Sequence, residues 1–231
     1  MITKKHEIAI KYLEGVCKGY SHSLIMKGEK GTGKTEIVFK TLEKLGFQEG
    51  VNYSYIANHI TPKGLVNFLQ KVNELEEPKI AILDDIDECL KNAQTIGVLK
   101  GALWEAGGIR RISWTSSREK INFIFGGRVV IILNKIRKTN SLIEALIDRG
   151  YFYEFNLTNK EMLNLMKERT KYPTKELYKK LTLKQRFKVF DFITKNSLGS
   201  EKLSLRSLEL GFGLLLANPH HYQQLLLRQI R

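Results

Sequence analysis

The sequence has few cysteines and no long apolar segment. Its 231 residues include two cysteines, Cys17 and Cys89, which stand alone and lack the spacing of metal ligands. No apolar run approaches the ~20 residues needed to cross a bilayer, and the first residues lack the apolar segment of a secretion signal. These absences predict a cytoplasmic protein that has no membrane partner.

Acidic residues are scarce relative to basic ones. The chain has 38 lysines and arginines against 24 aspartates and glutamates, which gives a formal net charge of +14. The excess is uneven, because residues 1–150 carry 23 basic and 17 acidic side chains and residues 151–231 carry 15 and 7. Such a field favours a polyanionic partner, above all a nucleic acid. A solvated, lysine-rich surface is the alternative.

The chain has only four prolines, no internal repeats and no low-complexity segment, so we expect no long linker. Up to about residue 156, apolar strand-like runs alternate with helical patterns, which predicts an α/β fold with a three-layer core and a parallel sheet. The expected strands lie at 24–26, 51–57, 80–83, 129–133 and 151–155. From Thr158 onward the pattern is helical only. We therefore predict an α/β core over residues 1–156 and a small, all-helical lid domain over residues 157–231.

Local signals place several element boundaries. Thr61 and Pro62 read as the N-cap and first residue of a helix. The segment Thr158–Glu161 has the residues of a capping box. Ile112–Trp114 and Phe123–Phe125 are predicted as short strands on either side of a polar tip at Ser116–Lys120.

Residues 28–35 form a complete phosphate-binding loop between the apolar run that ends at Met26 and a helical pattern that starts at Lys34. Such a loop can turn its backbone N–H groups around a polyphosphate, and the helix N-terminus adds partial positive charge. Lys34 is expected to reach the β- and γ-phosphates, and the Thr35 hydroxyl is expected to ligate Mg²⁺. The predicted contacts of ATP are Gly28, Glu29, Lys30, Gly31, Thr32, Gly33, Lys34 and Thr35.

A second apolar run, Ile80–Leu83, ends in a pair of aspartates. In P-loop NTPases a carboxylate at the end of such a strand holds the magnesium ion. Asp84 is therefore expected to share Mg²⁺ with Thr35, and Asp85 to polarise the attacking water. Asp87 and Glu88 are less well placed for either of these two roles.

At this point the chain resembles the AAA+ ATPases, and the resemblance covers essentially its whole length. That family places a polar residue at the end of its fourth core strand, and Asn134 follows the apolar run Val129–Leu133. The resemblance implies that Asn134 is the sensor 1 residue, which hydrogen-bonds the γ-phosphate or the attacking water. It also implies an arginine finger before the fifth strand, where Arg149 would enter the nucleotide site of a neighbouring subunit.

The resemblance extends into the helical domain and has one departure. The segment Leu203–Leu208 is similar to the sensor 2 region, which implies that Arg206 reaches the γ-phosphate from a lid helix. Asn58 stands where many members keep a polar residue that restrains the catalytic acid. The acidic pair is Asp-Asp instead of the usual Asp-Glu, and it is similar to the pairs of some helicase loaders and phage ATPases.

The resemblance implies a homo-oligomer, most often a ring or spiral of six, because Arg149 would complete the site of another subunit. With the basic charge, it predicts an ATP hydrolase that works on DNA, as a helicase-like translocase or as a loader recruited by a replication protein. The segments Asn58–Lys63 and Ser116–Lys120, with Arg110 and Arg111 nearby, are candidate loops of the central channel, where basic and hydroxyl side chains would contact a phosphodiester backbone. Solvated turns are the alternative for these segments. A protein remodeller, a metabolite kinase and a non-hydrolysing ATP switch are the alternatives.

Overall fold

The computed structural model describes residues 3–134, 141–197 and 203–230. Contacts between residues divide the chain into two compact units. One unit consists of His6–Glu29 and Lys34–Phe155, and the other of Met1–Lys5, Lys30–Gly33 and Asn156–Arg231. None of the helices in the described part of the chain is long and apolar enough to cross a membrane.

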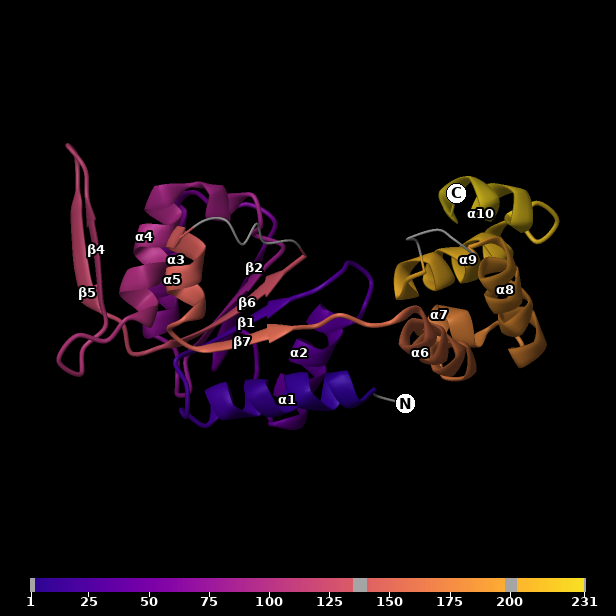
Figure 1. Cartoon of the computed structure of the whole chain (residues 1–231), viewed down its shortest axis with the longest axis horizontal. Coiled ribbons are helices and arrows are strands. Elements are labelled where there is room, and N and C mark those ends of the chain that lie inside the picture. Colours follow the sequence, from indigo (N-terminus) through magenta and orange to yellow (C-terminus); the bar gives the residue numbers. More distant parts are fainter. Residues whose placement is uncertain (1–2, 135–140, 198–202, 231) are drawn as a thin grey trace. The chain divides into compact units, whose positions relative to one another are not determined.

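The first unit is built on a five-stranded parallel sheet with the order β2-β3-β6-β1-β7 (Figure 1). Its strands are β1 (Ser23–Lys27), β2 (Tyr53–Ala57), β3 (Ile80–Asp84), β6 (Arg128–Leu133) and β7 (Tyr151–Glu154). The three central strands are almost completely buried, which explains their continuous apolar sequences. Because all five run in the same direction, the loops that follow them meet at one edge of the sheet.

Helices cover both faces of this sheet, which makes the three layers expected for the α/β class (Figure 1). Helices α1 and α2 lie on one face, and α3, α4 and α5 lie on the other. Their bounds are α1 (Lys4–Cys17), α2 (Lys34–Lys44), α3 (Pro62–Asn73), α4 (Ala93–Leu103) and α5 (Ser141–Ile147), with a 3-10 turn, η1, at Cys89–Lys91. The Thr61 side chain accepts a hydrogen bond from the N–H of Gly64, so the predicted N-cap of α3 is confirmed.

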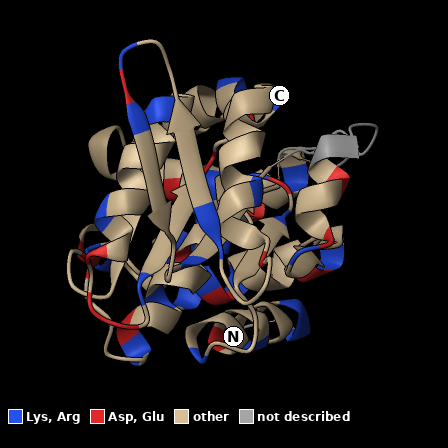
Figure 2. Cartoon of the chain, turned by 90° about the vertical axis from the view of Figure 1, so that its left-hand side faces the viewer, with Lys and Arg blue, Asp and Glu red and all other residues tan. Residues whose placement is uncertain are grey.

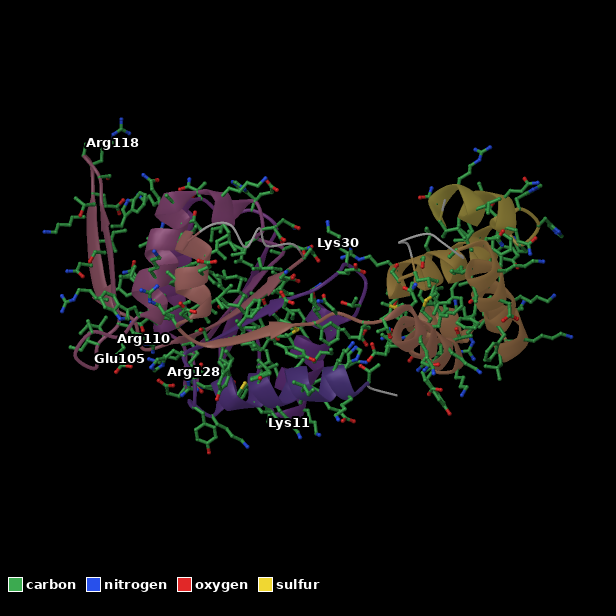
Figure 3. All side chains as sticks on the ribbon, viewed as in Figure 1. Lys11, Lys30, Glu105, Arg110, Arg118 and Arg128 are labelled. Atoms are coloured by element: carbon green, nitrogen blue, oxygen red, sulfur yellow. The ribbon has the colours of Figure 1, made fainter. Side chains whose placement is uncertain are left out.

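The two short strands predicted before β6 pair as an antiparallel hairpin, β4 (Arg111–Thr115) and β5 (Lys120–Ile124). Trp114, Ile121 and Phe123 turn toward the protein and pack against the buried core, while the alternate residues are exposed. Figure 2 looks onto this hairpin, where basic residues occur at the tip and near the base. Arg118 stands at the tip (Figure 3).

The prediction that Arg110 contacts a phosphodiester backbone is wrong. Its side chain is only 8% exposed and lies below the hairpin, with its guanidinium 5.5 Å from the centre of the Phe125 ring (Figure 3). The guanidinium donates to the carbonyl oxygens of Ala102 at 3.1 Å, Gly127 at 2.6 Å and Gly126 at 3.2 Å. These bonds satisfy the buried charge, so Arg110 anchors the hairpin and is not available to a ligand. Its neighbour Arg111 is exposed.

The second unit is helical, as the sequence predicted. Its helices are α6 (Asn159–Lys171), α7 (Glu176–Lys179), α8 (Leu183–Asn196), α9 (Leu205–Ala217) and α10 (Tyr222–Ile230). They enclose a separate apolar core, which includes the fully buried side chains of Met166, Leu208 and Phe212. Gly211 lets α9 approach α8 closely, because a Cβ atom there would lie 2.4 Å from Val189 Cγ1.

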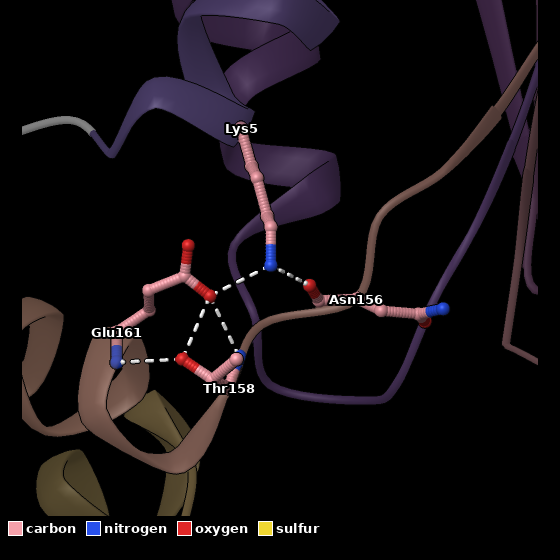
Figure 4. Close-up of polar contacts among 4 residues, drawn as sticks. All are labelled: Lys5, Asn156, Thr158 and Glu161. Atoms are coloured by element: carbon pink, nitrogen blue, oxygen red, sulfur yellow. Dashed lines mark hydrogen bonds and ion pairs between the residues drawn. The ribbon is translucent and has the colours of Figure 1, made fainter.

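The start of this unit has the capping box that the sequence predicted (Figure 4). The Thr158 hydroxyl accepts from the N–H of Glu161 at 3.2 Å, and Glu161 Oε2 accepts from the N–H of Thr158 at 2.7 Å. Lys5 Nζ donates to the same carboxylate oxygen at 2.7 Å and to the carbonyl of Asn156 at 2.6 Å. These hydrogen bonds, first the one from Lys5, lower the pKa of Glu161 to about 2.

Candidate nucleotide-binding site

The phosphate-binding loop connects β1 to α2, as predicted, and its glycines are required by its geometry. Gly31 and Gly33 have φ angles of 73° and 92°, in the left-handed region that glycine enters at little cost. A Cβ atom on Gly28 would lie 2.1 Å from the carbonyl oxygen of Phe155. The Gly28 N–H donates to the carbonyl of Leu133 at 3.0 Å, which ties the start of the loop to the end of β6.

Lys34, the first residue of α2, has its ammonium group inside this loop. Lys34 Nζ donates to the carbonyls of Gly28 at 2.6 Å and Glu29 at 2.7 Å, and to Asn134 Oδ1 at 3.2 Å. The residue is only 5% exposed. A buried cation at the N-terminus of a helix is suited to phosphate oxygens, which the helix N–H groups and the lysine attract together.

Thr35 and Asp84 meet at the carboxyl edge of the sheet. The Thr35 hydroxyl donates to Asp84 Oδ2 at 2.8 Å, and the hydroxyl of Tyr55 on β2 donates to the same oxygen at 3.2 Å. Asp84 is 6% exposed, and within the described ranges its other oxygen, Oδ1, is buried and has no hydrogen-bond partner. Burial raises the pKa of Asp84, and the neighbouring Asp85 carboxylate raises it further, against the hydrogen bonds of Thr35 and Tyr55 and the charge of Lys34.

These groups fit a magnesium ion. Mg²⁺ prefers carboxylate, hydroxyl and water oxygens, and Asp84 Oδ1 is a buried carboxylate oxygen without a hydrogen-bond partner among the described residues. A divalent cation here would offset the desolvation of the carboxylate. Thr35 and Asp84 are the residues that would hold it, directly or through its water ligands.

Asp85 and Asn134 lie side by side, at the ends of β3 and β6. Asn134 Nδ2 donates to Asp85 Oδ1. The backbone of Asp85 has a φ angle of 54°, which is uncommon for a residue with a side chain, and its N–H donates to the carbonyl of Ile132 at 3.0 Å. Strain of this kind clusters at functional sites. Asn58 also has positive φ, 71°, and its N–H donates to the carbonyl of Asp84 at 2.9 Å.

Asp87 has a structural task that sequence reasoning missed. Its carboxylate accepts from the backbone N–H of Asn134, at 3.0 Å from Oδ1 and 3.3 Å from Oδ2. This contact joins the turn after β3 to the end of β6 and holds Asn134 beside Asp85. The sequence shows an acidic residue three positions after Asp84. It does not show the partner of that residue, because the partner is set by the pairing of β3 with β6.

Arg149 lies at the other end of the sheet from the loop of its own chain. Tyr151 pairs with Leu24 near the amino end of β1, and a Cβ atom on Gly150 would lie 1.9 Å from Ser23 Oγ. The loop starts after Lys27, about 13 Å further along β1 at ~3.3 Å per residue. The Arg149 guanidinium donates to the carbonyl of Ala145 and lies 5.5 Å from the centre of the Trp104 ring.

Arg206 is the second residue of α9, in the helical unit. Ser204 is the N-cap of this helix, and its hydroxyl accepts from the N–H of Ser207 at 3.1 Å. The N–H of Leu205 donates to the carbonyl of Gly31 at 2.9 Å. A Cβ atom added to Gly31 would lie 3.7 Å from Arg206 Cγ. The start of α9 therefore touches the tip of the phosphate loop, Lys30–Gly33, which belongs to the same compact unit.

The two segments predicted to contact a polyanion also meet. Lys63, at the start of α3, forms an ion pair with Glu119 at the tip of the hairpin. This pair uses the only acidic side chain of β4, β5 and the turn between them in the described chain. The exposed charges left on the hairpin, Arg111, Arg118 and Lys120, are therefore all positive.

The sheet order, the loop after β1 and the carboxylates after β3 define a P-loop NTPase fold of the AAA+ type, which confirms the fold class and the family resemblance at the level of the fold. No family model matches the sequence. A curated relative is an uncharacterized 36.7 kDa protein in the nrdC-mobD intergenic region of Enterobacteria phage T4, 26% identical over 178 residues. The match covers 70% of this chain and 54% of the phage protein, so this chain spans about half the length of that relative.

A solved structure gives an independent comparison. The crystal structure of a DNA replication initiation factor matches 99% of this chain and 66% of its own, with a TM-score of 0.55 and 13% sequence identity. At this identity the likeness establishes the fold alone. The nucleotide contacts, the metal ligands and the catalytic roles are therefore argued from this chain's own geometry.

Proposed function

We propose that this protein is an AAA+ ATPase that couples the binding and hydrolysis of ATP at subunit interfaces to work on DNA, as a helicase-like translocase or as a replication loader. The observation that carries the proposal is the meeting of five side chains at one edge of the sheet. They are Lys34, Thr35, Asp84, Asp85 and Asn134, linked by hydrogen bonds of 2.8 to 3.2 Å and by the contact between Asn134 and Asp85.

Each of the five has a distinct role in this proposal. The ammonium of Lys34 would neutralise the β- and γ-phosphates of ATP. Thr35 and Asp84 would hold Mg²⁺, which would offset the negative charge of the same phosphates. Asp85 accepts a proton from the attacking water. Asn134 orients that water or the γ-phosphate while it holds the Asp85 carboxylate.

Arg149 makes the site a shared one in this proposal. Its segment lies at the other end of the sheet from the loop of its own chain, and its guanidinium lies over the ring of Trp104. In a ring or spiral, most often of six copies, it would complete the site of the next subunit, where an arginine is worth about 10³–10⁵ in rate. Arg206 belongs to the proposed lid, residues 157–231. It would bring a second positive charge to the γ-phosphate bound by the proposed core, residues 1–156.

DNA is the proposed substrate because of the charge of the chain and the form of the hairpin. The chain has a net charge of +14, and the exposed charges of the hairpin, on Arg111, Arg118 and Lys120, are all positive. The alternate positions of the same face include Ser113 and Asn122, whose polar groups can contact phosphate oxygens. Phosphate contacts of this kind bind a backbone without reading its sequence.

Steady-state ATP hydrolysis tests the proposal when it is measured alone, with single-stranded DNA, with duplex DNA and with an unfolded protein. We expect DNA to raise the rate several-fold and the unfolded protein to leave it unchanged. Lys34→Ala controls for contaminating ATPases and should show no turnover. Stimulation by unfolded protein alone would favour a protein remodeller, and a rate that no polymer changes would contradict the proposal.

Variants of the hairpin locate the DNA contact. Replacement of Arg111, Arg118 and Lys120 by glutamine should weaken DNA binding and reduce the dependence of log Kd on log salt by up to about 2–3, because three phosphate contacts are lost. Replacement of Lys11, Lys18 and Lys44 by glutamine removes the same charge from exposed positions on or next to helices α1 and α2. An equal loss in both triple variants would mean that only net charge matters.

A non-hydrolysing ATP switch is the second candidate, and one contact favours it. The Asp85 carboxylate already accepts a hydrogen bond from Asn134, and aspartate is one methylene shorter than the glutamate usual at this position. A single-turnover experiment separates the candidates, since a switch would bind ATP and leave it uncleaved with and without DNA.

A further inference from the structure

Tyr55 contacts the magnesium site from a strand that carries no part of the phosphate-binding motif. Its hydroxyl lies 3.2 Å from Asp84 Oδ2. In the parallel pairing of β2 with β3, Ala57 is opposite Asp84 and Tyr55 is opposite Ile82. Tyr55 is therefore the diagonal neighbour of Asp84 on one face of the sheet, a separation that a long aromatic side chain can span.

The ring of Tyr55 is held in place by an aromatic contact. Phe39 of α2 packs edge-on against it, with ring centroids 5.0 Å apart and planes at 70°. The same Phe39 ring lies 6.1 Å from the ring of Tyr53. Helix α2 thus supplies both the metal-binding Thr35 and the support for the tyrosine that reaches Asp84.

Two hydroxyl groups converge on a single oxygen of Asp84. Thr35 and Tyr55 both donate to Oδ2, at 2.8 Å and 3.2 Å, whereas Oδ1 has no partner within the described ranges. The terminal torsion of an aspartate is broad and nearly two-fold, so one hydrogen bond alone defines its plane poorly. Two donors on Oδ2 fix the plane and leave Oδ1 directed elsewhere.

We propose that Tyr55 is a positioning residue of the magnesium site, which fixes the Asp84 carboxylate so that Oδ1 is free for the ion or its water ligands. This inference rests on the proposed function, because it requires Mg²⁺-dependent nucleotide binding. Groups that orient a metal ligand commonly contribute 10–100-fold to metal affinity.

The test is the Mg²⁺ requirement of nucleotide binding in Tyr55→Phe, measured with a fluorescent ATP analogue. The Mg²⁺ concentration for half-maximal binding should rise about tenfold. Nucleotide affinity in EDTA should stay that of the wild type, because the ring and its contact with Phe39 remain. A structural role of Tyr55 would lower both affinities together, and that result would overturn the proposal.

Tyr53→Phe is the matched control. It removes a hydroxyl from the same strand and keeps a ring beside Phe39, whereas the hydroxyl that donates to Asp84 belongs to Tyr55. The Mg²⁺ requirement of this variant should equal that of the wild type. If Tyr55→Phe also equals the wild type, the role of Tyr55 is refuted while the proposed function stands. If wild-type protein shows no Mg²⁺-dependent nucleotide binding, both fail.

A double-mutant cycle gives a second readout that does not depend on the size of the single effect. In an Asp84→Asn background, the change from tyrosine to phenylalanine at position 55 should no longer alter the Mg²⁺ requirement, because the carboxylate it orients is gone. Additive effects of the two changes would show that Tyr55 acts independently of Asp84.

Discussion

Lys34 Nζ lies 3.2 Å from Asn134 Oδ1, and the other end of the same amide donates to Asp85. The lysine of the phosphate loop and the acid after β3 are therefore connected through one side chain. The N–H of Asn134 is in turn fixed by Asp87. A change in the position of Lys34 would be transmitted to Asp85 through this chain of contacts.

This connection predicts the behaviour of Asn134→Ala. Lys34 keeps its two carbonyl partners and the loop glycines are unchanged, so ATP affinity should stay within about threefold. Turnover should fall about 10²-fold or more, the usual cost of losing one preorganised donor at a reacting group. Nucleotide titration and single-turnover hydrolysis measure the two separately. A variant that loses binding and turnover in proportion would show that Asn134 serves only to shape the loop.

The buried guanidinium of Arg110 gives a prediction about stability. Arg110→Met should lower the free energy of unfolding by about 3 kcal/mol or more, because the three carbonyls that it satisfies lose their donor in a buried position. Arg111→Met changes the adjacent, exposed residue and should cost within about 0.5 kcal/mol. Urea denaturation measures both. Equal effects of the two variants would mean that Arg110 is not the anchor of the hairpin.

Glu161 gives a prediction about pH. Its pKa in the folded protein is about 2, below the ordinary value of about 4.5 that it regains on unfolding, so its interactions stabilise the folded state above pH ~4.5. That contribution is lost as the pH falls toward 2. The stability difference between the wild type and Glu161→Gln should therefore be constant at pH 5–7 and shrink at pH 3–4.

The Lys5→Gln background isolates the cause of that pH dependence. Lys5 is the largest contributor to the lowered pKa of Glu161, so its removal should flatten the pH dependence of the difference. The effect is modest in size because the pair lies near solvent. Thermal melting at several pH values is the measurement, and a difference that does not change with pH would contradict the assignment.

Much of the fold was predictable from local sequence. The phosphate loop, the apolar strands and the capping box at Thr158 are encoded by neighbouring residues, and the structure has each of them in its expected place. The loop motif also identifies Lys34 and Thr35 without knowledge of any distant contact. The roles of these residues in catalysis are still predictions.

The rest depends on pairing between segments far apart in the sequence. Tyr55 reaches Asp84 only because β2 and β3 pair in one register, and Asp87 meets Asn134 only because β6 lies beside β3. The charge of Arg110 suggests a surface position. In the structure its guanidinium is buried and donates to carbonyls of α4 and of the turn before β6. Neither a motif nor a hydrophobic pattern contains this information.

The mixing of two inactive variants tests the central claim, a nucleotide site shared between copies of the chain, most directly. Arg149→Ala should bind ATP and lose turnover, because the neighbouring site lacks its arginine. Asp85→Asn should also bind ATP and lose turnover, because its own site lacks the acceptor of the water proton. If each site takes its arginine from the neighbouring subunit, mixed assemblies contain some sites that are intact, so activity should return and be greatest near equal proportions. Absence of activity at every ratio, or full activity of Arg149→Ala as a monomer, would contradict the account.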